Sequence, residues 1–202
     1  MPHILTIPRH QAPKLPVSGC ITTDVLDFLH PPLWQARANV EHDERYLQAV
    51  VYLLLFNTAG QVWCYQRVGG DARLDGRCSC GVGGHVDQQD AQDAQDASQP
   101  FNAVTTLHQT LLRELGEELQ MTPADLRDVR LCGLIYEGLS AVGRVHLGVL
   151  YTAVWCGAHD PEPQPNEKLA SLGFVDLEDI CAQPRFELWS RLAAQYLLQH
   201  AP

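Results

Sequence analysis

Hydrophobic residues recur along this chain with two different periods, which predict strands in some segments and helices in others. Gln48 to Asn57 is a nearly unbroken apolar run with β-branched and aromatic members, as expected for a buried strand. Thr58-Ala59-Gly60 predicts a turn, and residues 61–67 alternate, so the two segments predict a hairpin. Further strands are expected at 129–136, 144–155 and 172–175.

Apolar residues at helical spacing predict two longer helices. Leu112, Leu115 and Leu119 fall on one side of a segment that begins near Asn102. A second amphipathic helix is expected from Glu187 to His200. Residues 122–125, Thr-Pro-Ala-Asp, form a capping box with proline at the first helical position, which predicts a short helix. This order of elements predicts a mixed sheet between helices.

The chain is expected to form one domain with an N-terminal extension. Residues 1–45, with four prolines before residue 17 and a short helix expected near 23–29, are interpreted as an extension packed on the core. Residues 46–202 form the domain itself. Within it, residues from about 87 to 100 repeat Ala-Gln-Asp and lack large apolar side chains, which predicts a mobile low-complexity insertion. Its Asp90, Asp93 and Asp96 are interpreted as solvated loop acids.

Composition excludes several classes of protein. With 202 residues, 46% of them hydrophobic, the chain can bury one good core. A net charge of −10 argues against long nucleic acid as a partner, because phosphate backbones bind basic surfaces. No apolar run reaches the roughly 18 residues of a membrane span, and no export signal is visible, so we expect a cytoplasmic protein without a membrane partner. Seven scattered cysteines are typical of reduced thiols.

The segment from Arg113 to Met121 contains the strongest chemical signal. Glu114, Glu117 and Glu118 stand at i, i+3 and i+4, so one face of the expected helix presents three carboxylates. Such a face is often only solvated. A divalent cation would convert the mutual repulsion of these carboxylates into attraction, and a small phosphorylated substrate could then bind through the metal.

Together with the glycine-rich run Gly81-Val82-Gly83-Gly84, this segment resembles the signature of the Nudix hydrolases. That signature is Gly, five residues, Glu, seven residues, then Arg-Glu-apolar-any-Glu-Glu-any-Gly-apolar. The right half fits except that Gln120 replaces the late glycine. The left half is displaced, because Gly84 lies 29 residues before Arg113 and about 15 residues are inserted. Counting back from Arg113 places Thr105 where the signature has its first glutamate.

The resemblance implies an α/β/α sandwich with a mixed sheet over roughly residues 46–200, and it implies a metal site. It assigns Glu114, Glu117 and Glu118 as side-chain ligands of Mg²⁺ or Mn²⁺, with the Gly84 carbonyl as a backbone ligand. Arg113 would orient the acidic cluster. The general base is left open between a signature glutamate and a distant carboxylate, with Glu167 as the first candidate and Glu137 as the second. Arg67 and Arg73 are candidate phosphate contacts because guanidinium groups suit phosphate oxygens, although both could equally be surface arginines.

The implied activity is Mg²⁺-dependent hydrolysis of a nucleoside diphosphate linked to another moiety, or of a similar diphosphate, by water attack at phosphorus. Three runs, beginning at Glu44, Ala72 and Val142, are similar to bacterial Nudix proteins described as predicted phosphoesterases. One alternative is an enzyme like the isoprenoid-diphosphate isomerases, for which Cys80 and His85 would join the metal site. Another is a non-catalytic ligand sensor. A homodimer is common among similar proteins and is a further expectation.

Overall fold

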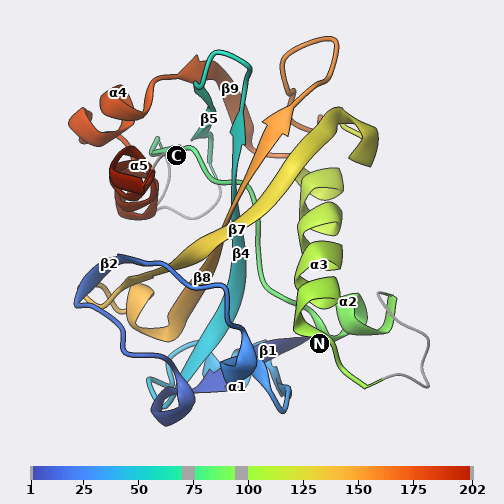
Figure 1. The fold of residues 1–202 in the computed structure, drawn as a ribbon, viewed down its shortest axis with the longest axis vertical. Coiled ribbons are helices and arrows are strands. Elements are labelled where there is room, and N and C mark those ends of the chain that lie inside the picture. Colours follow the sequence, from blue (N-terminus) through green and yellow to red (C-terminus); the bar gives the residue numbers. More distant parts are fainter. Residues whose placement is uncertain (1, 70–75, 94–99, 201–202) are drawn as a thin grey trace.

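The computed structural model describes residues 2–69, 76–93 and 100–200, which fold around one large sheet (Figure 1). The strands are β1 (His3–Pro8), β2 (Ser18–Ile21), β3 (Leu33–Ala36), β4 (Tyr46–Phe56), β5 (Val62–Arg67), β6 (Cys78–Ser79), β7 (Leu126–Glu137), β8 (His146–Trp155) and β9 (Leu169–Val175). The α-helices are α1 (Arg37–Val40), α2 (Gln88–Asp93), α3 (Ala103–Glu118), α4 (Leu177–Ala182) and α5 (Leu188–His200). The 3-10 helices are η1 (Arg9–Gln11), η2 (Asp27–Leu29), η3 (Pro123–Asp125) and η4 (Gly143–Val145).

The sheet is mixed, because one central pair of strands is parallel. Its main path runs β2-β7-β8-β4-β1-β3, with β5, β6 and β9 joined through β4 and β5. Strands β4 and β8 pair in parallel from Gln48 opposite His146 to Phe56 opposite Val154, whereas the other strand pairs are antiparallel. Strand β5 follows β4 after a turn at Gly60 and pairs with it antiparallel, which confirms the predicted hairpin.

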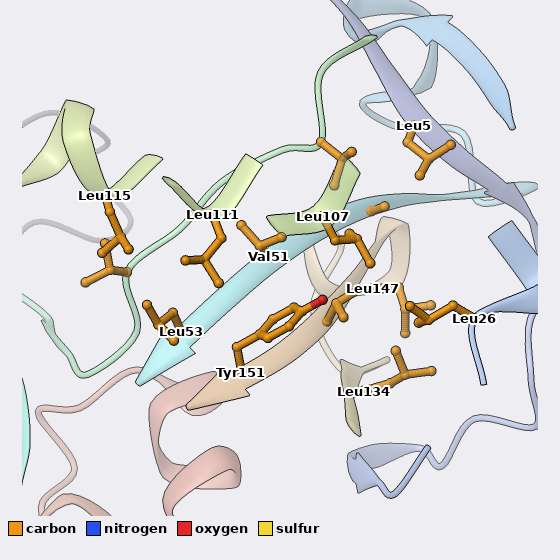
Figure 2. Packing of buried hydrophobic residues seen from close by; sticks show 14 of the residues in the cluster. Leu5, Leu26, Val51, Leu53, Leu107, Leu111, Leu115, Leu134, Leu147 and Tyr151 are labelled. Carbon is orange, nitrogen blue, oxygen red and sulfur yellow. The ribbon is translucent and has the colours of Figure 1, made fainter. Parts of the chain in front are cut away.

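Helices cover both faces of this sheet, with α3 on one side and α4 and α5 on the other (Figure 1). Leu107, Leu111 and Leu115 of α3 point at the β4 and β8 strands, where Val51 and Tyr151 lie (Figure 2). A second buried cluster, which includes Leu54, Ile180 and Ala193, packs under α4 and α5. The predicted α/β/α sandwich is therefore confirmed.

The N-terminal residues are built into the sheet as well as packed on the core. Strand β1 lies between β3 and β4, and β2 pairs with β7 through Ser18 opposite Glu137. The helix expected near residues 23–29 is reduced to the single 3-10 turn η2. Residues 2–45 therefore contribute three strands to the same sheet as the rest of the chain.

The low-complexity insertion begins with a helix that the sequence analysis did not predict. Residues 88–93 form α2, which packs against α3 and β1. Asp96 and the rest of residues 94–99 lie outside the described residues. Helix α2 thus lies against the helix that carries the three glutamates (Figure 1).

Helix α3 has clear structural signals at both ends. Its N-cap is Asn102, whose side chain accepts a hydrogen bond from the Thr105 backbone N–H at 3.2 Å. Its last helical residue is Glu118, and Leu119 takes an extended conformation with φ of −123°. Gln120 is not among the described residues with positive φ, and its backbone N–H donates to the Glu162 carbonyl at 2.8 Å. The left-handed glycine of the signature is unnecessary here, because the chain leaves the helix as an extended segment.

Two other expectations concern cysteines and membranes. The seven cysteines are all unpaired. Among the described residues, no helix combines the length and the apolar character that a bilayer span requires.

Candidate active site

The three predicted carboxylates lie on one face of α3 but in different environments. The Glu114 side chain is 13% exposed and accepts a hydrogen bond from Arg113 Nη1 at 2.8 Å. The Glu117 side chain is 59% exposed and lies 3.2 Å from the same nitrogen. Burial raises the pKa of Glu118, whose Oε2 is buried and has no hydrogen-bond partner among the described residues. The helix therefore presents one solvated and two partly desolvated carboxylates.

Arg113 pairs with two of the three carboxylates. Its Nη1 contacts Glu114 and Glu117, and its Nη2 donates to the His85 carbonyl of the glycine-rich segment at 2.9 Å. Burial alone would lower the pKa of Arg113, but hydrogen bonds and charge from Asp90 and Glu114 raise it instead. The guanidinium thus stays charged and ties the acidic helix to the glycine segment.

Asp90 belongs to this cluster, which the sequence analysis did not predict. It is only 1% exposed and binds Arg113 through two hydrogen bonds, at 2.7 Å from Nε and 3.0 Å from Nη2. Its Oδ2 also accepts from Thr110 Oγ1 at 2.8 Å and from the Asp87 backbone N–H at 3.0 Å. The interpretation of Asp90 as a solvated loop acid is therefore wrong.

The sequence did contain a signal for Asp90. Six positions after Gly84, where the signature has its first glutamate, this chain has Asp90. Counting forward from Gly84 finds this acid, whereas counting back from Arg113 finds Thr105, which belongs to the helix cap. The extra residues thus lie between the acid and Arg113, and α2 brings the two side chains together.

Glu118 combines burial with nearby negative charge. Burial, and then the charge of Glu114, raises its pKa to about 8. Glu167 contributes to the same shift, so the structure brings this distant carboxylate into electrostatic reach of the helix. A carboxylate in this position is stabilised in its charged form by any cation that binds beside Oε2.

The loop that carries Glu167 is fastened to the end of α3. Gln164 Nε2 donates to the Gly116 and Leu119 carbonyls at 3.1 and 3.0 Å, and the Gln164 backbone N–H donates to the Glu118 carbonyl at 2.8 Å. These bonds satisfy carbonyls that a helix end leaves free. The Glu167 backbone N–H in turn donates to the Gln164 carbonyl at 2.9 Å.

Arg67 lies at the end of β5 and has an unsatisfied buried donor. Its Nη2 donates to the Tyr65 hydroxyl at 3.2 Å, but its Nε is buried and has no hydrogen-bond partner in the part of the chain that the structure describes. The charge of Arg67 lowers the pKa of Glu118, against the larger effect of burial, so the two side chains lie in the same region. Arg73, the other candidate phosphate contact, lies outside the described residues.

The glycine-rich segment approaches the helix closely. A Cβ on Gly84 would lie 2.4 Å from Glu114 Oε1, so a larger residue here would displace that carboxylate. The Gly84 carbonyl accepts a hydrogen bond from the Val51 backbone N–H at 2.9 Å. As a metal ligand it would therefore use its second lone pair.

Several residues that the sequence analysis considered for this site have their contacts elsewhere in the structure. Glu137 is 5% exposed and accepts hydrogen bonds from the Leu139 and Ser140 backbone N–H groups at 3.1 Å, which anchors a turn after β7. Cys80 is buried in the core under α5, where burial raises its pKa to about 12. His85 Nε2 contacts His146 and Gln48 instead. The cysteine, histidine and glutamate set of the isomerase alternative is not assembled among the described residues.

Among the described residues, the carboxylates do not surround a common point as the ligands of a bound metal would. Across the described ranges, no three histidine, cysteine or acidic side chains converge on one point. Glu114 and Glu117 are turned toward Arg113, so a metal would have to share them with the guanidinium or draw them away from it.

The architecture and the acidic helix define a Nudix fold, and comparisons with solved structures agree. The chain is similar to Tm1382, itself described only as a candidate Nudix hydrolase, with a TM-score of 0.75 and 22% identity over 98% of each chain. It is also similar to the NUDIX domain of Shewanella oneidensis NrtR complexed with ADP ribose, with a TM-score of 0.54 and 19% identity over 77% of this chain and 89% of that one. The chain therefore has the Nudix fold.

A sequence relative extends this comparison. The chain is 29% identical over 165 residues to protein YmaB of Bacillus subtilis (strain 168), which covers 80% of this chain and 76% of that protein. No family model matches the chain.

Proposed function

We propose that this protein is a Mg²⁺-dependent pyrophosphohydrolase of a nucleoside diphosphate derivative. One observation carries the proposal: two buried polar atoms of the same region, Glu118 Oε2 and Arg67 Nε, have no hydrogen-bond partner among the described residues. A buried unsatisfied polar group is costly, so such atoms are expected to be completed by a ligand. A metal ion beside Glu118 and a phosphate beside Arg67 would satisfy both.

The residues of the site fit a hard divalent cation. The candidate ligands are all oxygens, from Glu114, Glu117, Glu118 and the Gly84 carbonyl, and oxygen is the donor that Mg²⁺ and Mn²⁺ prefer. Bound there, the ion would neutralise charge on the phosphoryl oxygens. Arg113 and Asp90 would hold the carboxylates in place from behind, as outer partners of metal ligands do.

The remaining chemistry belongs to the protein side chains. Arg67 would bind a phosphoryl oxygen through its Nε–H, while the Tyr65 hydroxyl holds its Nη2. Glu167 is the proposed general base, because it acts electrostatically on Glu118 from a loop outside the helix and is not among the residues that Arg113 contacts. It would take a proton from the water that attacks phosphorus.

The proposal is tested by assaying the full-length protein with Mg²⁺ on ADP-ribose and other nucleoside diphosphate derivatives. ADP-ribose comes first because it is the molecule bound to the similar NrtR domain. Release of a nucleoside monophosphate is expected, and in ¹⁸O-labelled water one product should carry ¹⁸O on phosphorus. Double-bond migration without phosphate release would support the isomerase alternative instead.

Variants distinguish the catalytic carboxylates from other surface acids. Glu117→Gln and Glu118→Gln should abolish turnover, while Glu178→Gln on exposed α4 should retain it. Glu167→Gln should lower kcat by about 10²- to 10⁴-fold with Mg²⁺ affinity unchanged, as expected for the loss of a general base. Full activity of both α3 variants, or the absence of Mg²⁺ and Mn²⁺ binding near α3, would overturn the proposal, and the latter result would favour a sensor.

A further inference from the structure

Two imidazoles and one amide meet near the beginning of β4. His85 Nε2 lies 3.2 Å from His146 Nε2 and 3.0 Å from Gln48 Oε1. The pairing of β4 with β8 sets Gln48 opposite His146, and a β-bridge sets His85 opposite Val50. The three side chains are therefore held together by the sheet itself.

The neighbouring hydrogen bonds fix which atoms face the meeting point. His146 Nδ1 lies 2.7 Å from the Val142 carbonyl, which can only accept, so Nδ1 carries a proton. In the neutral ring His146 Nε2 is then a free lone pair directed at His85. Gln48 Nε2 donates to the Val40 carbonyl at 3.3 Å, which turns Oε1 of that buried amide toward the same point.

These separations match the spacing between ligands of a tetrahedral transition metal. Zinc–nitrogen bonds of about 2.0–2.1 Å at tetrahedral angles place neighbouring ligand atoms about 3.3 Å apart. The Nδ1–H to carbonyl bond of His146 is also the usual outer contact of a metal-binding histidine, because it orients the ring and sets its tautomer.

The surroundings are compatible with an added cation. Both histidine residues are partly exposed. Two cations act on His85, Arg37 and Arg113. Arg37 is paired with Glu41 at 3.3 Å, and Arg113 is paired with Asp90 and Glu114. Glu41 also acts electrostatically on His146 and is 38% exposed, so it could reorient as a fourth ligand.

We propose that His85 Nε2, His146 Nε2 and Gln48 Oε1 form a binding site for a borderline divalent metal ion such as Zn²⁺ or Co²⁺. Water or Glu41 completes the coordination. The ion replaces the proton that His85 Nε2 shares with the two other atoms, and that proton moves through solvent to His85 Nδ1. The ligand atoms of this site differ from the oxygen ligands proposed for Mg²⁺, because imidazole nitrogens favour transition metals.

The test uses the metal-stripped full-length protein, labelled with ¹⁵N-histidine, in excess Mg²⁺. Zn²⁺ should shift the ring resonances of His85 and His146 together at one equivalent, while the other seven of the nine histidines serve as internal references. Co²⁺ should give the intense visible absorption of tetrahedral coordination. Shifts confined to other histidines, or none at all, would overturn the proposal.

Variants show whether the site itself binds the ion. His146→Gln should weaken Zn²⁺ binding by at least about tenfold, whereas His108→Gln, at an exposed position of α3, should leave it unchanged. Gln48→Glu should tighten binding, because a carboxylate replaces a neutral amide oxygen. Equal affinity in the wild type, His146→Gln and Gln48→Glu would show that the metal binds elsewhere. The outcome is independent of hydrolase activity, since none of these measurements requires turnover.

Discussion

The pairing of Asp90 with Arg113 leads to the most demanding prediction. Replacing Asp90 by Asn keeps the size of the side chain but removes its charge. Arg113 then loses its bidentate partner, and the amide group must face a guanidinium, a hydroxyl and a backbone N–H that all donate to Asp90. We expect both a less stable fold and a looser acidic cluster.

The magnitude follows from the burial of the pair. The Asp90 side chain is 1% exposed and that of Arg113 is 24% exposed. Breaking a fully buried ion pair by removing one partner costs about 3–5 kcal/mol. Because Arg113 is partly solvated and keeps Glu114, we expect the lower end, about 3 kcal/mol. For a domain of this size, that corresponds to a fall in Tm of roughly 6–12 °C.

The assay is urea and thermal unfolding of the wild type and Asp90→Asn, followed by circular dichroism. Asp93→Asn is the matched control, because Asp93 is an exposed acid on the same helix whose side chain accepts from Gln89. It should change the free energy of unfolding by less than about 0.5 kcal/mol. If Asp90→Asn also stays within that range, the structural role assigned to Asp90 is wrong.

Three further outcomes follow from the same geometry. In metal-free protein, the folded pKa of Glu118 is about 8 against an ordinary 4.5, so the native state binds a proton that the unfolded state lacks. The free energy of unfolding of the protein should therefore fall with rising pH, by up to about 1.4 kcal/mol per pH unit between these two pKa values. Glu118→Gln should remove this dependence on pH. If urea unfolding gives the same slope of unfolding free energy against pH for the wild type and Glu118→Gln, the raised pKa of Glu118 is refuted. Gly84→Ala should weaken Mg²⁺ binding at least about tenfold in calorimetric titrations, since its Cβ would meet Glu114 Oε1 at 2.4 Å; unchanged binding would contradict the close approach. Glu137→Gln should lower stability by about 1–3 kcal/mol through its turn contacts and leave kcat intact, so a large loss of kcat in the folded variant would reinstate it as a base.

Local patterns determined much of the architecture. The apolar run of β4, the helical spacing of the leucines in α3 and the capping box at Thr122 each depend on neighbouring residues, and each gave the correct kind of element. The same spacing correctly placed Glu114, Glu117 and Glu118 on one helix face. Arg113 could be assigned to them because it lies within one helical turn.

Contacts between residues far apart in the sequence could not be predicted from the sequence alone. The tract that repeats Ala-Gln-Asp has no large apolar residues, and yet α2 folds because Asp90 is neutralised by an arginine 23 positions away. Residues 2–45 join the sheet through backbone hydrogen bonds to β4 and β7, which no local period encodes. Glu167 reaches the site because Gln164 caps α3 from 48 positions beyond Gly116.

The sequence by itself therefore determined the acidic helix, the glycine segment and the kind of chemistry they suit, because spacing within a helix or a short loop fixes which side chains share a face. Only the tertiary structure decided which acid supports Arg113, that Glu118 and Arg67 keep unsatisfied buried atoms, and that His85 faces His146 across the sheet. Burial and pairing between distant segments arise from the packing of the whole chain, so they are properties of the fold and not of any local pattern.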